Sequence, residues 1–169
     1  MSIRVLAAVA VTFLAGLGVA SAAAADPVAT AQADLQKLVS DATALHSTVL
    51  ADAQKISADI QALQGSTNRQ TVRQTLQADF QKIQSDRQQL LPAVQSDWST
   101  LKSDLAAVKE AKAGKGQLKP LLQQAQQQLQ QERSSVQAAL QAAHQAAQAL
   151  RQSLKGSGHG KGGGGSTNP

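Results

Sequence analysis

The stretch Gln32-Ala-Asp-Leu-Gln-Lys-Leu-Val-Ser-Asp41 decides the fold, because it returns 45 residues later as Gln77-Ala-Asp-Phe-Gln-Lys-Ile-Gln-Ser-Asp86. The match continues past these ten positions, and four aspartates keep their places: Asp34, Asp41, Asp52 and Asp59 fall on Asp79, Asp86, Asp97 and Asp104. Self-similarity at one fixed offset indicates a repeated structural unit. It predicts that the first two helices are an internal duplication, two copies of one long amphipathic helix in tandem.

Apolar residues recur every three or four positions through three segments of the chain. In the first copy the stripe includes Leu35, Leu38, Val49 and Ile56, a spacing typical of a heptad seam. The third segment carries a compatible stripe but fills much of it with alanine. Alanine, glutamine, leucine and lysine all favour helix, and almost nothing favours strands. The expected class is all-α, an elongated antiparallel three-helix bundle with coiled-coil-like seams.

Signals for helix ends divide residues 26–155 into three helices, at about 27–64, 69–113 and 118–155. Asp26 offers an N-cap acceptor before Pro27, and Thr67 and Gln70 have the spacing of a capping box. Glycines at 114 and 116 mark the second connection. Short connections favour antiparallel neighbours, so the chain is expected to run up, down and up again.

Pro92 lies in the middle of the second predicted helix, where it removes a hydrogen bond to the carbonyl of Gln88. We expect a kink rather than a division of the helix, because Leu90, Val94 and Trp98 keep the apolar stripe in phase across the proline. The same stripe predicts that Trp98 fills the core as its largest side chain.

Residues 1–25 have the composition of a cleaved secretory signal peptide. Arg4 supplies a positive start, residues 5–19 form a short apolar run, and small residues follow at 20–25. An uncleaved membrane anchor is the alternative, although a span needs about 20 mostly apolar residues. Residues 156–169 are expected to form a disordered Gly/Ser-rich tail. The expected location is periplasmic or extracellular, with no cysteine for disulfides.

Basic residues are concentrated near the expected ends of the rod. Four lysines should gather at one end: Lys109, Lys112, Lys115 and Lys119. Four cations should gather at the other: Arg69, Arg73, Arg151 and Lys155. Two explanations stay open, since such charge either keeps the helix ends soluble or contacts an anionic lipid or envelope polymer. Nucleic acid is not an expected partner, because no aromatic residues are interleaved with the basic ones.

The residues that carry chemistry elsewhere lack the necessary spacing here. The eight repeated aspartates each precede a seam residue, where charge sets helix register, and seven-residue spacing separates neighbours by about 10 Å. His46 and His144 have no second ligand at four residues' distance, and His159 lies in the tail. No Cys exists, and no Ser or Thr lies in a nucleophile elbow. We therefore expect no catalytic residue, no cofactor and no metal.

Arg87 and Glu132 interrupt the apolar seams of the second and third helices. Counted from the connection between those helices, the two residues fall at different levels, so a mutual salt bridge is not expected. Two explanations stay open: both side chains reach the rim of a narrow rod, or they fix the register of a partner.

These observations favour a secreted or periplasmic, non-enzymatic helical interaction protein. As a scaffold or a holdase, it would bind protein partners along its rod surface. Self-association is the other expected kind of protein contact. The alternative is a helical module that binds lipid or another anionic surface and whose bundle opens on membranes.

Overall fold

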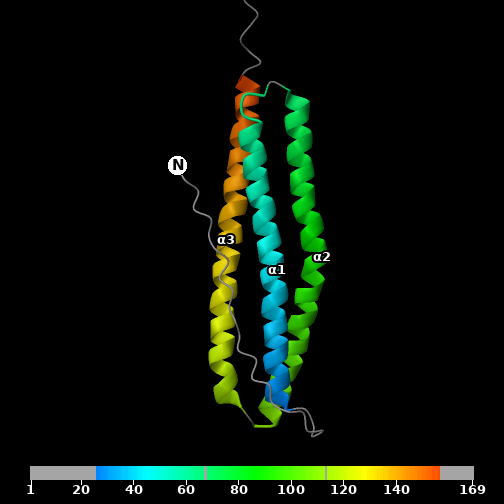
Figure 1. Cartoon of the computed structure of the whole chain (residues 1–169), viewed down its shortest axis with the longest axis vertical. Helices are drawn as coiled ribbons and strands as arrows, with labels where there is room; N and C mark the ends of the chain where they lie inside the picture. The colour runs from blue at the N-terminus through cyan, green and yellow to red at the C-terminus, as the bar shows by residue number, and fades with distance from the viewer. Residues whose placement is uncertain (1–25, 67, 113, 157–169) are drawn as a thin grey trace, which may run out of the picture.

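Three long helices make up the computed structural model, which describes residues 26–66, 68–112 and 114–156. They are α1 (Pro27–Ala62), α2 (Arg69–Glu110) and α3 (Lys115–Gly156), and the described residues contain no strand. The chain runs along α1, returns along α2 and runs forward again in α3 (Figure 1). The all-α class is therefore confirmed. The predicted signal peptide and nearly all of the predicted tail lie outside the described residues.

Asparagine and aspartate side chains start the first two helices. The Asp26 carboxylate accepts the Val28 amide at 3.0 Å, with a proline as the first helical residue. At α2, Asn68 Oδ1 accepts the amides of Gln70 and Thr71, both at 3.1 Å. The N-cap is thus Asn68, one residue after the predicted Thr67, because its short side chain reaches two amides of the first turn that have no helical partner.

The connection between α2 and α3 is as long as predicted but lies three residues earlier in the chain. α2 ends at Glu110, and α3 begins at Lys115, three residues before its expected start. Lys112 and Gly114 both have left-handed backbones, with φ of 52° and 67°. The Gly114 carbonyl then accepts the amides of Gln117 and Leu118, which starts the helix. A side chain at Gly114 would collide with Val28 of α1, so glycine is required there.

α2 continues through Pro92 as one helix of 42 residues. The axis of α2 changes direction in its middle part (Figure 1), as expected where a proline removes a backbone hydrogen bond. Division of the helix at Pro92 does not occur.

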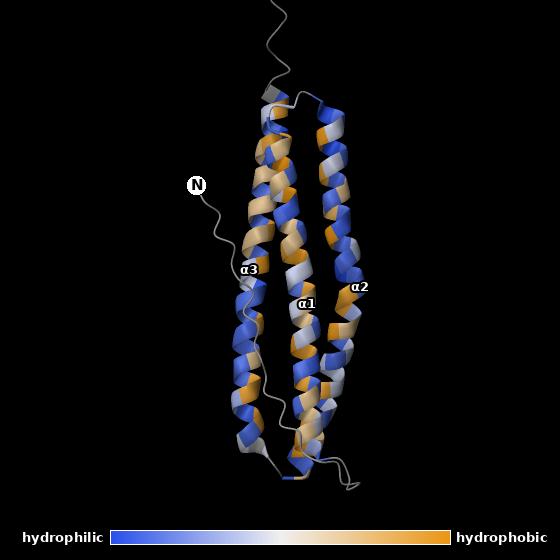
Figure 2. Ribbon diagram, in the orientation of Figure 1, coloured by the Kyte–Doolittle hydropathy of each residue, from blue (hydrophilic) through white to orange (hydrophobic). Residues whose placement is uncertain are grey.

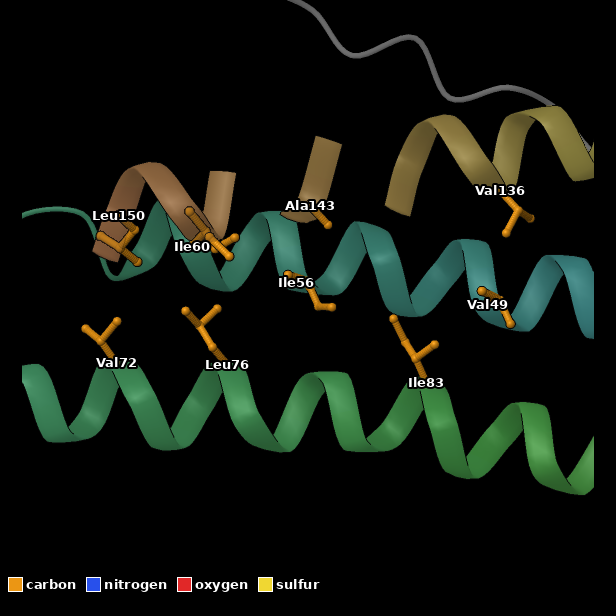
Figure 3. Close-up of a cluster of buried hydrophobic side chains, with 10 residues drawn as sticks. Val49, Ile56, Ile60, Val72, Leu76, Ile83, Val136, Ala143 and Leu150 are labelled. Carbon is orange, nitrogen blue, oxygen red and sulfur yellow. The ribbon is translucent and has the colours of Figure 1, made fainter. Parts of the chain in front are cut away.

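α1 packs against both other helices, whereas α2 and α3 barely meet. In the close-up of Figure 3, Val72, Leu76 and Ile83 of α2 point toward α1, and α3 covers another side of α1. The largest core cluster contains buried residues of all three helices: Val49, Ile56, Ile60, Val72, Leu76, Ile83, Val136, Ala143, Ala147 and Leu150. Two smaller clusters continue toward the α2–α3 connection. The core is therefore organised around α1.

The prediction that Trp98 fills the core is wrong, because 58% of this residue is exposed. The preceding Asp97 is buried and pairs with Lys37 of α1. Successive helical residues differ by about 100° around the axis, so an inward Asp97 turns Trp98 away from α1.

None of the three helices, over the residues that the structure describes, offers a stretch both long and apolar enough to cross a membrane.

Candidate functional site

The start of α2 and the end of α3 together form a basic hollow of about 540 Å³. Its lining consists of four cations and two apolar residues: Arg69, Val72, Arg73, Arg151, Leu154 and Lys155. On each helix the two cations are four residues apart, a spacing that places them on one face. All four residues that the sequence assigned to this end therefore line one hollow, although their role as partner contacts stays a prediction.

One hydrogen bond fixes the geometry of this basic hollow. Arg69 Nη2 donates to the backbone carbonyl of Leu154 at 2.6 Å, which ties the start of α2 to the last turns of α3. Leu154 carries one of the last carbonyls of α3, which have no helical partner, so the guanidinium satisfies an otherwise open acceptor. Arg73, Arg151 and Lys155 are exposed beside it.

The four predicted lysines all lie near the connection at the opposite end, and two of them line one hollow. Lys109 and Lys119 line a hollow of about 310 Å³, whose apolar lining is Leu105, Val108, Leu118 and Leu122. Lys112 is exposed in the connection, and Lys115 is the first residue of α3. This end is thus more apolar than the basic hollow.

The repeated aspartates form an ion-pair ladder between α1 and α2. Each rung has a lysine of one helix between an aspartate four residues ahead and a buried aspartate across the interface. The three rungs are Lys37 with Asp41 and Asp97, Lys82 with Asp86 and Asp52, and Lys55 with Asp59 and Asp79. The cross-helix distances lie between 2.5 and 3.2 Å. The ladder therefore sets how α2 lies against α1.

Hydrogen bonding shifts the pKa values of the three ladder lysines and of two aspartates, Asp41 and Asp86. The pKa of Lys37 is raised by its hydrogen bonds to Asp97 and Asp41, and the pKa of Asp41 is lowered mainly by Lys37. In the Lys82 rung, Asp86 raises the pKa of the lysine, and the lysine lowers the pKa of Asp86. The predicted position of these aspartates was the flank of the interface, whereas Asp52, Asp79 and Asp97 are buried.

A fourth position in the ladder lacks its lysine. Residue 100, which is 45 residues after Lys55, is a threonine. Asp34 and Asp104 lie near each other there, and the pKa of Asp104 is raised by its hydrogen bond with Asp34 and then by burial. An acid pair without a cation holds a proton more tightly, so this position has the opposite electrostatics to the three rungs.

A polar cluster joins α1 to α3 at mid-rod. The Thr43 hydroxyl donates to both carboxylate oxygens of Glu132, at 3.0 and 3.1 Å, and the Gln128 amide donates to one of them at 3.0 Å. His46 Nδ1 lies 3.0 Å from the same carboxylate. Glu132 thus pairs with α1, while Arg87 is exposed on α2. This cluster could not be predicted from the sequence, because no repeat relates α3 to α1 and marks which of their residues lie at the same level.

The Glu132 cluster does not join its hydroxyl to its histidine. The Thr43 hydroxyl is bonded to the carboxylate, not to His46, so the imidazole has no hydroxyl to activate. Next to the cluster, α1 and α3 enclose a groove of about 280 Å³ with apolar walls that include Leu35 and Leu121. Across the described ranges, no three side chains of the metal-binding types gather at one point.

No family model, curated protein or solved structure matches this chain.

The side of α2 that faces α3 makes few contacts with that helix. Phe80 stacks on His144 of α3, with ring centroids 4.6 Å apart, and Leu105 lines the hollow at the other end together with Leu122. Trp98 comes 18 residues after Phe80, about five helical turns, and so lies on the same face. Leu91 shares this face to within about 20° and is 37% exposed. We call Leu91 and Trp98 the open face.

Proposed function

We propose that this chain is a non-enzymatic helical interaction protein that binds an apolar segment of a protein partner at the open face. The observation that carries the proposal is that α2 and α3 barely meet while Trp98, on the face of α2 that carries Phe80, is 58% exposed. Exposed tryptophan is characteristic of binding surfaces, where it supplies a large contact area with little loss of conformational freedom.

The surroundings of the open face support a helical or extended partner segment. The glutamine-rich part of α3, residues 123–131, offers uncharged side chains that donate and accept hydrogen bonds. In Figure 2 the corresponding part of α3 is mostly hydrophilic, whereas the part nearer its end carries more apolar colour. An apolar segment lying on Leu91 and Trp98 would therefore meet a polar rim on the α3 side, which is the usual anatomy of an interface.

We also propose the finer architecture, an antiparallel coiled-coil-like bundle in which α1 and α2 derive from an internal duplication. Two rungs of the ladder support this idea. The offset of 45 residues carries Lys37, Asp41 and Asp52 onto Lys82, Asp86 and Asp97, and these six residues are the members of those two rungs. A duplicated helix folded back on its copy would produce this pattern, in which the lysine of each copy pairs with an aspartate of the other copy.

Export to the periplasm or the outside of the cell is part of the same proposal. Its support is the composition of residues 1–25, and amino-terminal sequencing of the mature protein tests it.

Trp98 provides the test of binding, because it is the single tryptophan of the chain. We would titrate the full chain with a helix-forming apolar peptide and follow tryptophan emission. Binding at the open face should shift the emission to the blue. Leu91→Gln should weaken the affinity at least about tenfold, since a buried leucine contributes about 1.5–3 kcal/mol.

Ala93→Gln is the matched control, because it adds the same side chain to an exposed position on the opposite side of α2. It should leave the affinity unchanged. Absence of a blue shift at saturating peptide would refute the proposal. Sedimentation velocity on the peptide-free chain identifies the other occupant, since a discrete oligomer with buried Trp98 would assign the open face to a second copy.

A further inference from the structure

The cations of the basic hollow differ from those of the ion-pair ladder in how they are neutralised. Each ladder lysine holds two aspartates. None of the ion pairs among the described residues involves Arg69, Arg73, Arg151 or Lys155. Four positive charges from two helices therefore surround one hollow, and no carboxylate of the described residues pairs with them, so the local field attracts anions.

We propose that the basic hollow binds the phosphate headgroup of an anionic phospholipid. Guanidinium groups match phosphate oxygens because they present paired donors in a fixed plane. Arg73 and Arg151 supply two such groups from opposite helices, while Arg69 is held by the Leu154 carbonyl. Lys155 adds a further charge at the rim.

Two features favour a lipid over a long acidic polymer. The hollow contains Val72 and Leu154 next to the cations, and an amphiphile has apolar atoms directly beside its phosphate. The four cations of the hollow also surround one small site, whereas a long polymer would be bound best by a stripe of charge along the rod. An end-on contact presents the hollow to a bilayer and leaves the open face clear, so this inference does not depend on the proposed function.

The test measures binding of the full chain to vesicles of equal parts phosphatidylglycerol and phosphatidylcholine. Arg73→Gln combined with Arg151→Gln should lower the affinity about 25-fold, because each cation at an anionic membrane contributes about a factor of five. Arg69 is left in place because it also holds α3. Circular dichroism confirms that the variant keeps its helices.

Arg87→Gln combined with Arg133→Gln is the matched control. Both residues are exposed, and they lie on the same two helices in the middle of the rod. This control changes the net charge equally and should retain most of the vesicle binding. Equal loss in both double variants would mean general attraction of a basic protein and would overturn the site. Failure of wild type to bind vesicles, displacement by millimolar inorganic phosphate, or tighter binding to an acidic polysaccharide would also overturn it.

Discussion

Gly114 illustrates how one residue can fix the meeting of two distant parts of the chain. It has a left-handed φ of 67°, and a Cβ there would collide with the Val28 side chain at the start of α1. Valine is branched at Cβ and has few other rotamers, so it cannot easily move aside. The glycine thus allows the α2–α3 connection to pass close beneath α1.

Gly114→Ala should destabilise the fold by about 1–3 kcal/mol, the combined result of backbone strain and the collision with Val28. Urea unfolding followed by circular dichroism measures the change. Gly116→Ala is the control two residues later, because a Cβ there meets nothing and the position is helical. That variant should be neutral or stabilising by up to about 1 kcal/mol, and equal losses in both variants would contradict the explanation.

Thr100 occupies the one ladder position without a lysine, so Thr100→Lys should complete a fourth rung. The new ammonium would lie near Asp34 and Asp104 and replace a repulsive acid pair with an ion pair. We expect stabilisation of about 0.5–1 kcal/mol in urea unfolding, partly from the better helix propensity of lysine.

The neighbouring substitution Ser99→Lys separates the contribution of the ion pair from that of helix propensity. It gives a similar gain in charge and propensity, but its side chain lies about 100° around the helix from position 100. Its stabilisation should be smaller. If Thr100→Lys gains as much with Asp34 changed to Asn as without that change, the fourth rung does not form.

At the scale of the helices, the α1–α2 ladder predicts a stability window in pH. The folded-state pKa values of Asp41 and Asp86 are lowered from 3.8, so the stability they contribute is present above pH 3.8 and is lost as the pH falls through the folded value. Lys37, Lys55 and Lys82 have pKa values raised above 10.5, mainly by hydrogen bonds to aspartates. Their contribution is complete below pH 10.5 and is lost as the pH rises through the folded values.

The urea concentration at the midpoint of unfolding should therefore decrease both as the pH falls below 3.8 and as it rises above 10.5. Asp86→Asn should flatten part of the acid flank, because the variant has no carboxylate to protonate at that position. Asp104 acts in the opposite sense: its raised pKa adds stability as the pH falls, and Asp104→Asn should steepen the acid loss. An unchanged pH profile in Asp86→Asn would contradict the role of the ladder.

The helices themselves could be predicted from sequence, because period and capping are local properties. The three segments, the start at Pro27 and the grouping of Arg69, Arg73, Arg151 and Lys155 all depend on spacing along the chain. What could not be predicted is rotation about the helix axis. An inward Asp97 is favourable only once Lys37 lies opposite, and this choice exposes Trp98, which a hydropathy pattern alone places in the core.

Contacts to α3 were the hardest to predict. The repeat aligns α1 with α2, but α3 shares little of it, so the levels of Thr43, His46 and Glu132 could not be matched in advance. The open face could not be predicted from the sequence for the same reason. It depends on how far apart α2 and α3 lie at mid-rod.

For the whole molecule, packing around α1 predicts unequal local stability. Backbone amides of α1, which is covered from two sides, should exchange with solvent most slowly. Amides near Trp98 in α2 and in residues 123–131 of α3 should exchange about tenfold faster or more, since fewer buried contacts hold them. Hydrogen exchange read by mass spectrometry measures this order. Uniform protection along all three helices would contradict it.

The central position of α1 also has a consequence for the order of folding. A hairpin of α1 and α2 can assemble its ion pairs and bury one face of α1 before the last third of the chain is available. The second face of α1, with Val49 and Ile60, is then completed only when α3 docks. A chain in which only α1 and α2 have folded would therefore have an uncovered apolar face on α1, and such a stage would be open to misassembly with another copy.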